Sequence, residues 1–394
     1  MTGSTVYRQK PSQVVRLGRA DRSWYATWFW EIDRVLLLLV AMLIGIGLIA
    51  VAAASPSAAA KDGLPALHYF WRQIVWIMLG VPLMIAVSML PRDSARRLSI
   101  GAAVLFSLLL ALVPIAGTQV NGAVRWLGVD PFRFQPSEFL KPFFVVATAW
   151  MLSLRARDRG LPVVPLTGLI VAVIAALLMK QPDFGQTVIF CSVWAALLVI
   201  SGVQTRFLMA LGGAGVGLLA LAFVFYRNGR DRVIEFLTGS GDTYHVDVGY
   251  ATITNGGLVG LGPGGGVQKF RLPEAHNDYI FSVIGEEFGL ISCIVIAIIY
   301  LAIMVRVFLK LLDEEDQFVM LAASGLAIQF GLQAVINMAV NVQLVPSKGM
   351  TLPFISYGGS SLLAVSMGFG LLLAFTRRNP FLTRSPYVVT WSGK

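Results

Sequence analysis

The sequence predicts an all-α polytopic membrane protein with about ten transmembrane helices and one long extracytoplasmic loop. Of the 394 residues, 56% are hydrophobic and only 13% are charged, whereas a soluble domain carries about 25% charged residues. The mean hydropathy is +0.74. Long apolar runs recur along the chain, and helices are favoured because a helix satisfies its own backbone hydrogen bonds in lipid.

Ten apolar runs each come close to the ~20 residues that a helix needs to cross a bilayer. They form one predicted transmembrane domain at residues 31–380, between a basic tail at 1–30 and a second tail at 381–394. We expect the membrane-spanning helices at residues 35–54, 73–90, 98–117, 136–154, 161–179, 186–202, 207–226, 278–305, 318–340 and 358–375.

The distribution of basic residues predicts the orientation of the chain. With both termini in the cytoplasm, 19 of the 31 Lys and Arg residues lie on the cytoplasmic side and 12 on the outer side. This bias follows the positive-inside rule. The net charge of +10 does not indicate nucleic-acid binding, because the basic residues lie at the ends of apolar runs and form no stripe with interleaved aromatic residues.

Four segments on the predicted outer side carry polar or ionisable residues that a loop serving only to connect two helices would not need. They are residues 118–135, 181–183, 227–277 and 341–357. The loop 227–277 is far longer than ordinary connections, and such loops are usually functional or disordered. Its glycine-rich run lacks the strand and helix of a nucleotide-binding loop, and the chain has no Walker A sequence, so we expect no nucleotide.

The end of this loop holds the densest group of ionisable residues. Asp278 precedes an apolar run, where a carboxylate is either a helix cap or a reactive group, and the local sequence leaves both open. Glu286 and Glu287 lie inside the following predicted span, where ionisable groups indicate function unless they pair with a Lys or Arg from elsewhere. The group within ten residues comprises Lys269, Arg271, Glu274, His276 and Asp278.

Three further patterns fall on other predicted spans. Glu138 and Lys141 share a helix face at i, i+3, which indicates a mutual salt bridge, a charged cavity wall, or both. The prolines, glycines and hydroxyls of residues 345–361 predict irregular backbone lining a cavity; within it, Lys348 either holds an anionic group or lies at the interface. Gln329, Gln333 and Asn337 recur every four residues, which we interpret as a helix–helix hydrogen-bond seam.

Six motifs in this order resemble the SEDS family (shape, elongation, division, sporulation) of bacterial membrane proteins. The resemblance extends from about residue 35 to residue 380 and is closer to the division member than to the elongation member. Asn277 departs from it, since a Thr is more usual there. The motifs are NGAVRWL at 121–127, QPSE at 135–138, QPDFG at 181–185, LPEAHND at 272–278, GEEFG at 285–289 and PFISYGGSS at 353–361.

The resemblance implies a peptidoglycan glycosyltransferase that polymerises lipid II into glycan strands, with inversion, during septal cell-wall synthesis. Lipid II and polyprenyl-pyrophosphate-linked glycan would be the substrates, at the outer face of the bacterial cytoplasmic (inner) membrane. A class B penicillin-binding protein of the FtsI transpeptidase type and other division proteins would be the partners. The family's essential acidic residue falls on Asp278, the expected general base, and its cavity Glu and Lys fall on Glu138 and Lys141.

The expected site therefore surrounds Asp278. Glu274, His276 and Glu286 are expected to shape it, and a divalent cation, Mg²⁺ or Mn²⁺, is compatible with pyrophosphate chemistry, although the sequence names no ligand for it. A lipid II flippase or lipid-linked sugar transporter, and a non-catalytic division scaffold, remain alternatives. The expected substrate-binding residues are Arg125, Glu138, Lys141, Asp183, Lys269, Arg271, Lys348, Ser356 and Tyr357.

Overall fold

A computed structural model describes residues 24–120, 123–128, 133–156, 158, 160–225, 244–346 and 349–377. The chain divides into two units, of which residues 33–376 form one. The residues before and after them form the other, whose described part contains helix α1 (Trp24–Glu31). Every site residue predicted from the sequence belongs to the unit formed by residues 33–376.

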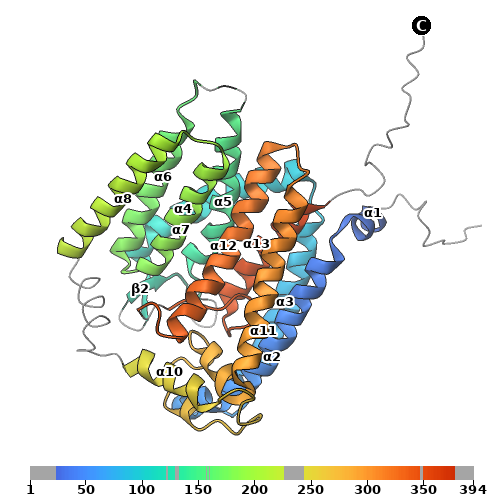
Figure 1. Ribbon diagram of the computed structural model, residues 1–394, viewed down its shortest axis with the longest axis vertical. Helices are drawn as coiled ribbons and strands as arrows, with labels where there is room; N and C mark the ends of the chain where they lie inside the picture. The colour runs from blue at the N-terminus through green and yellow to red at the C-terminus, as the bar shows by residue number, and fades with distance from the viewer. Residues whose placement is uncertain are drawn as a thin grey trace, which may run out of the picture. The chain divides into compact units, whose positions relative to one another are not determined.

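Ten helices in the described part of this unit coincide with the ten predicted spans (Figure 1). The largest difference is at the end of α2, which continues through Pro56 to Asp62 instead of ending near residue 54. The predicted all-α architecture is thus confirmed. The helices are α2 (Arg34–Asp62), α3 (His68–Ser88), α4 (Arg92–Ala116), α5 (Pro136–Leu154), α6 (Val163–Lys180), α7 (Phe184–Ile200), α8 (Thr205–Phe225), α11 (Ile280–Leu311), α12 (Gln317–Asn341) and α13 (Gly359–Thr376).

Burial separates central helices from peripheral ones. Among the described residues, seven helices are long and apolar enough to cross a membrane, and α7 is a shorter apolar helix. The apolar windows of α12 and α13 are 78% and 72% buried, whereas those of α3 and α4 are each 17% buried. Because α5 packs against α4, α6, α7, α12 and α13, the polar start of α5 lies in the middle of the bundle.

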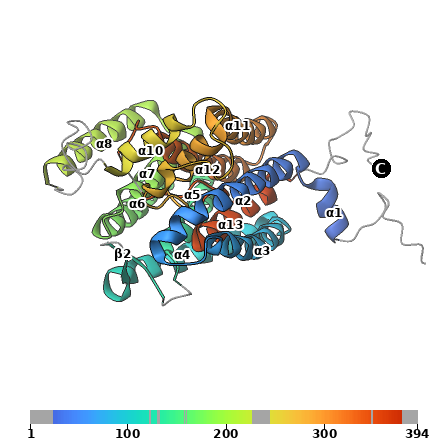
Figure 2. The ribbon, with the colours of Figure 1, turned by 90° about the horizontal axis from the view of Figure 1, so that it is seen from below.

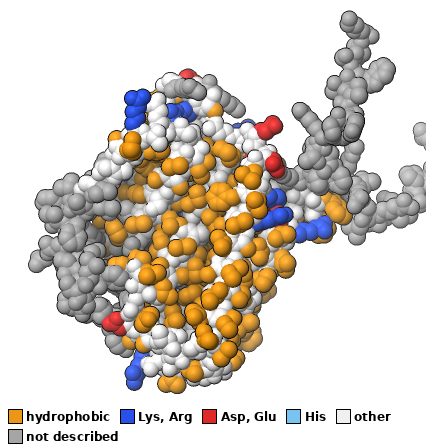
Figure 3. All heavy atoms as spheres, in the orientation of Figure 1, with side chains coloured by type: hydrophobic (Ala, Val, Ile, Leu, Met, Phe, Trp, Pro, Cys, Tyr) orange, Lys and Arg blue, Asp and Glu red, His pale blue; other side chains and the backbone are white. Residues whose placement is uncertain are grey.

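The outer surface of the bundle is apolar, as a lipid-facing surface must be. On α11 this surface includes Ile291, Ile294, Ile298 and Leu301, and 62% of Leu301 is exposed. Figure 3 shows hydrophobic side chains spread over the face that carries α11. Together with the ten helices, this surface shows a multi-pass membrane protein.

Hydrogen bonds join the four predicted outer segments at one end of the helices. The hairpin of β1 (Thr118–Val120) and β2 (Ala123–Trp126) contacts the turn before α7, and α10 (Tyr244–Asn255) contacts the segment after α12 through Gln343 and Asp247, 2.8 Å apart. Figure 1 shows α10 and β2 at this end, which Figure 2 views from below. The sequence predicted neither the hairpin nor α10, and residues 226–243 of the long loop lie outside the described part.

Helix α11 is broken at Gly289, whose φ of 80° and ψ of 173° are not helical. The glycine-rich loop occupies the break: Leu261 N donates to Glu286 O at 3.0 Å, and Leu290 N donates to Gly257 O at 3.0 Å. A Cβ atom on Gly289 would lie 2.3 Å from Leu258 O. The break therefore needs glycine, both for its dihedral angles and for the close approach of the loop.

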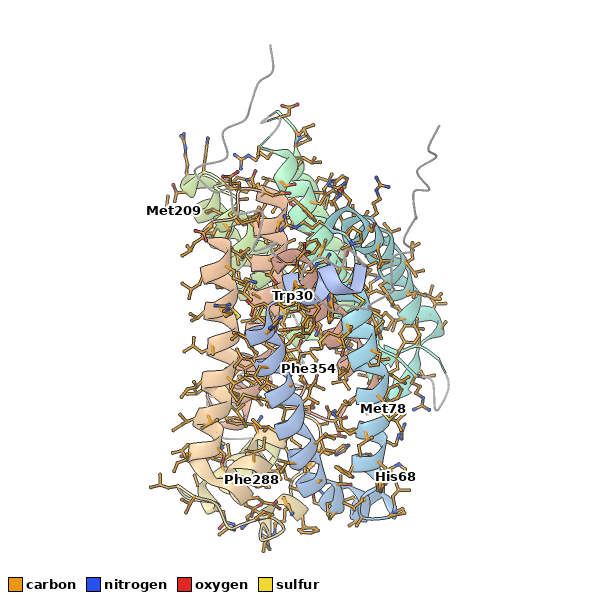
Figure 4. The ribbon with its side chains drawn as sticks, turned by 90° about the vertical axis from the view of Figure 1, so that its right-hand side faces the viewer. Trp30, His68, Met78, Met209, Phe288 and Phe354 are labelled. Carbon is orange, nitrogen blue, oxygen red and sulfur yellow. The ribbon has the colours of Figure 1, made fainter. Side chains whose placement is uncertain are left out.

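Residues 349–358 form a re-entrant segment that enters the bundle between α12 and α13 with irregular backbone, as predicted. The ring of Phe354 lies 6.0 Å from that of Phe330 and 5.7 Å from that of Phe369. Figure 4 shows Phe354 inside the bundle, away from the end marked by His68 and Phe288. Side chains satisfy its buried carbonyls: Tyr300 Oη donates to Pro353 O at 2.6 Å.

Candidate active site

The hairpin places Arg125 against the turn that begins α7. Arg125 Nε donates to Gln181 O at 3.0 Å, and Nη2 donates to Pro182 O at 2.5 Å. The same Nε lies 4.0 Å from Asp183 Oδ2. The Arg125 side chain remains partly exposed, so this guanidinium holds the turn and still presents positive charge at the outer end.

Asp183 caps α7 and is buried beneath Arg125. Its Oδ1 accepts a hydrogen bond from Gln186 N at 3.3 Å, and its Oδ2 accepts one from Gln135 Nε2 at 3.0 Å. Burial raises the pKa of this carboxyl, although the nearby Arg125 opposes the shift. Asp183 thus orders the junction between the hairpin, α5 and α7, and its predicted contact with substrate stays a prediction.

Glu138 and Lys141 form the predicted salt bridge in the first turns of α5. Lys141 Nζ lies 2.9 Å from Glu138 Oε2, and both side chains are buried. Gln186 of α7 donates to the other oxygen of Glu138. Lys141 Nζ also donates to Gln333 Oε1 of α12 at 2.9 Å. The pair is therefore neutralised internally and connected to two neighbouring helices.

Asp278 lies in the turn before α11 and is not its cap. The helix begins at Ile280, and its capping residue, Tyr279, makes no side-chain capping bond. The carbonyl of Asp278 accepts hydrogen bonds from Asn337 Nδ2 at 3.0 Å and Asn341 Nδ2 at 3.1 Å. The residue is partly exposed, and its carboxylate accepts no hydrogen bond from the described residues, so the backbone is fixed while the side chain is not.

Electrostatics place Asp278 in one neighbourhood with the charges of the other motifs. Burial raises the pKa of Asp278 to about 8, and the carboxylates of Glu274, Glu138 and Asp183 raise it further, whereas Arg125 opposes the shift. Desolvation and like charges both disfavour an ionised carboxylate. Residues from three predicted outer segments and the start of α5 thus act on one carboxyl group.

Lys269 makes internal contacts in the structure, and its predicted contact with substrate phosphate stays a prediction. Its Nζ is buried in an ion pair with Glu287 and donates to Ala53 O at 2.9 Å. Glu286 accepts hydrogen bonds from the backbone N–H groups of residues 267, 268 and 269 at 2.8–3.0 Å. The two carboxylates inside α11 therefore anchor the loop that precedes Asp278, as an ion pair and as an acceptor of backbone donors.

The other residues near Asp278 differ in exposure. Arg271 and Glu274 are exposed, and Glu274 adopts a φ of 48° in the tight turn. His276 stacks on Tyr69, with ring centroids 4.2 Å apart, and lies 5.2 Å from the ring of Tyr357. Burial lowers the pKa of His276 to about 4, so it is neutral at physiological pH.

The re-entrant segment meets the Asp278 turn directly. Ser356 Oγ donates to Asn277 O at 2.6 Å, and Tyr357 N donates to His276 O at 2.9 Å. Ser356 is buried and helps to fix the segment, while Tyr357 remains partly exposed. The predicted substrate contacts of both residues stay predictions. Lys348, the predicted phosphate ligand of this motif, lies outside the described residues.

Sequence reasoning missed Asn341 and Gly349, and it gave only part of the role of Gln333 and Asn337. Asn341 continues the four-residue spacing of the polar seam, so the pattern could have found it. The seam joins α12 to neighbouring helices, as predicted, because Lys141 of α5 donates to Gln333 and Ser282 of α11 donates to Asn341. It also bonds to the Asp278 turn and the re-entrant segment. No group of three or more His, Cys, Asp or Glu side chains that could hold a metal occurs among the described residues.

Comparisons with known proteins agree with this arrangement. A family profile described as cell cycle protein, covering FtsW, RodA and SpoVE, matches residues 34–380. The probable peptidoglycan glycosyltransferase FtsW of Caulobacter vibrioides is 38% identical over 92% of this chain and 93% of its own length. That of Trichlorobacter lovleyi is 35% identical over 87% and 92%, respectively.

Solved structures show the same fold. A chain from a study of the structural coordination of polymerization and crosslinking by a peptidoglycan synthase complex superposes with a TM-score of 0.71 and 29% identity, covering 88% of this chain and 97% of that one. The rod shape determining protein RodA of Thermus thermophilus gives a TM-score of 0.65 and 28% identity, with 88% and 96% covered. The chain therefore belongs to the SEDS family of FtsW, RodA and SpoVE, and its curated relatives favour the FtsW branch.

Proposed function

We propose that the protein is a peptidoglycan glycosyltransferase that polymerises lipid II during septal cell-wall synthesis. The observation that carries the proposal is Asp278, a partly exposed residue whose carboxylate accepts no hydrogen bond from the described residues and shares its electrostatic environment with Arg125 and Glu138. A carboxyl group with a pKa of about 8 is a stronger base than an ordinary aspartate once it is ionised. The names of the curated relatives support the same activity.

In the proposed reaction, Asp278 removes the proton from the 4-hydroxyl of the GlcNAc of the acceptor lipid II. The hydroxyl oxygen attacks the anomeric carbon of the donor glycan, and the bond from this carbon to the pyrophosphate oxygen breaks. One displacement converts an α-linked donor into a β-linked product. Because pyrophosphate is a good leaving group, a single carboxylate suffices, unlike glycoside hydrolysis, which usually needs two.

Positive charge is needed where the pyrophosphate leaves. Arg125 is the partly exposed cation in the electrostatic environment of Asp278, and Arg271, Lys141 and Lys348 remain proposed contacts. The described residues do not form a protein-built metal site. A Mg²⁺ or Mn²⁺ ion would take most of its ligands from the pyrophosphate, as Mg²⁺ commonly does in phosphate-binding sites, and would neutralise its charge.

We further propose that the protein works in the inner membrane at the division septum with both termini in the cytoplasm. The excess of basic residues on that side supports this orientation. A class B penicillin-binding protein of the FtsI type would crosslink the strands that this protein makes, alongside other division proteins. The solved relative from a complex that coordinates polymerization and crosslinking supports such a partner.

The test is polymerisation of purified lipid II by the full chain together with its penicillin-binding partner. Asp278→Asn should lower the rate by about 100-fold or more, because a general base contributes about 10²–10⁴-fold. Asp158→Asn is the matched control, since Asp158 is exposed on a connection predicted to be cytoplasmic. Polymerisation by Asp278→Asn at the normal rate would refute the assignment.

Two further measurements test the two alternative functions. A flippase predicts that labelled lipid II crosses vesicle membranes with this protein present, whether or not polymerisation occurs. A scaffold predicts that cells carrying Asp278→Ala still divide. The proposed enzyme predicts neither result.

A further inference from the structure

Four amide side chains form a ladder on one face of α12. Gln329, Gln333, Asn337 and Asn341 follow one another every four residues, and all four are buried. Residues four apart lie above one another on a helix. Burying an amide costs free energy unless it is hydrogen-bonded, so the partners of these groups show what the ladder holds.

The lower three amides bond to segments that are not helical. Gln333 Nε2 donates to Thr351 O at 3.0 Å, and Asn337 Nδ2 donates to Met350 O at 2.6 Å. Asn337 and Asn341 both donate to the carbonyl of Asp278. Four hydrogen bonds thus end on the re-entrant segment and the Asp278 turn, in addition to the bonds that a helix-packing seam would make. Of the latter, Lys141 of α5 donates to Gln333 Oε1, and Ser282 N and Oγ of α11 donate to Asn341 Oδ1.

Gln333 differs from the other amides because it also contacts the charged pair of α5. Its Oε1 accepts a hydrogen bond from Lys141 Nζ at 2.9 Å, while its Nε2 donates to Thr351 O. Both ends of one amide are therefore in use, one on the cation and one on the re-entrant segment. Movement of Lys141 toward a substrate would pull on Gln333 and hence on this segment.

We propose that Gln333 is a positioning residue that couples Lys141 to the re-entrant segment and, through Asn337, to Asp278. The proposal rests on the proposed function of Lys141 and Asp278. In this arrangement Gln333 and Asn337 hold the cation and the base at a fixed separation, whereas Gln329 takes no part. Misplacement by about 1 Å is enough to lower a rate about 100-fold.

Two substitutions at Gln333 break different parts of the coupling. Gln333→Met has a similar length and loses both hydrogen bonds. Gln333→Glu keeps an acceptor for Lys141 but cannot donate to Thr351 O. Gln329→Met is the matched control, because Gln329 is buried on the same face, one turn away, and its Oε1 has no hydrogen-bond partner among the described residues.

The measurement is kcat and KM for lipid II, with the full chain and its penicillin-binding partner, beside the thermal midpoint in detergent. Gln333→Met should lower kcat by about 10- to 100-fold with KM within about twofold, and Gln333→Glu should also lower kcat. Gln329→Met should match the wild type. If Gln333→Met loses its fold, Gln333→Glu decides: a normal kcat in this variant overturns the proposal.

A pH profile adds a readout that a purely structural role would not change. Asn337→Asp keeps the shape of the amide but places a carboxylate beside the Asp278 turn, so the rise of kcat with pH should move to higher pH. An unmoved profile would overturn the link between Asn337 and Asp278. The proposed function itself fails in a different way, when the wild type does not polymerise or Asp278→Asn polymerises normally.

Discussion

At the scale of single residues, Asp278 combines a fixed backbone with a free side chain. Two amide donors hold its carbonyl, which orients the Cα–Cβ bond. The carboxylate accepts no hydrogen bond from the described residues, and hydrogen bonds to an ionised carboxylate would lower its pKa. The residue is thus oriented through its main chain, and its basicity is preserved.

The pKa of Asp278 predicts a pH dependence of the rate. A general base acts when deprotonated, so a pKa of about 8 in the free protein means that kcat/KM should rise about tenfold per pH unit below pH 8 and level off above it. Glu274 helps to raise this pKa. Glu274→Gln should therefore move the rise to lower pH, by a few tenths of a unit because Glu274 is exposed and screened.

The pH profile is measured with the polymerisation assay between about pH 5.5 and about pH 9.5, a range that includes the expected pKa of about 8. Arg125→Gln should move the rise in the opposite direction, because Arg125 lowers the pKa of Asp278. A rate that stays level across this range would show that Asp278 is not the titrating base, because an ordinary aspartate, with a pKa of about 4, is already ionised throughout it.

Gly349 leaves room beside the carboxylate of Asp278. A Cβ atom placed on Gly349 would lie 3.1 Å from Asp278 Oδ2, which is within the space that an incoming hydroxyl would need. Gly349→Ala should therefore lower lipid II polymerisation by about tenfold or more, since general-base catalysis requires a hydrogen-bond approach of about 2.6–3.2 Å.

Gly45→Ala is the control for this substitution. Gly45 lies on α2, and a Cβ atom there meets nothing within 4 Å, so the activity should be unchanged and the helix should become slightly more stable. Equal activities of the two variants would show that the space beside Asp278 Oδ2 is not used.

At the scale of structural elements, side chains from the helices hold two irregular segments. Amides of α12 hold the re-entrant segment, and Glu286 and Glu287 of α11 hold the loop before Asp278. Their glycine and proline content predicted that both segments are irregular, because each of these residues affects the backbone at its own position. Lys269 lies in the loop and Glu287 in α11, so the two residues are not separated by a helical spacing that would predict their ion pair. The sequence alone therefore could not show whether Lys269 contacts substrate or another residue of the protein.

This pairing predicts the effect of removing Lys269. Lys269→Met leaves Glu287 buried without a counter-charge, which should destabilise the protein by about 3–5 kcal/mol. The double variant Lys269→Met with Glu287→Met removes both charges and should recover most of this loss. The measurement is the unfolding midpoint in detergent, and a normal midpoint for Lys269→Met with only a raised KM for lipid II would support the substrate-binding role.

At the scale of the whole molecule, the bilayer explains why ten helices could be predicted from sequence. Each span must be long, apolar and helical, and these demands are visible in one segment at a time. The convergence of Arg125, Glu138, Asp183 and Asp278 depends on how the helices pack. The distribution of basic residues predicted only that the segments carrying these four residues lie on the outer side of the membrane. The family resemblance identified Asp278 among its ionisable neighbours.

The predicted orientation can be tested by labelling cysteines from each side of the membrane. Val267 is 70% exposed in the loop at the end that carries Asp278, and Asp158 is exposed on the connection after α5. In a background with Cys191 and Cys293 replaced by Ala, a membrane-impermeant maleimide added to spheroplasts should label Val267→Cys. It should label Asp158→Cys only after the membrane is opened. The reverse pattern would place Asp278 in the cytoplasm, away from the proposed site of glycan polymerisation, and would contradict both the orientation and the proposed reaction.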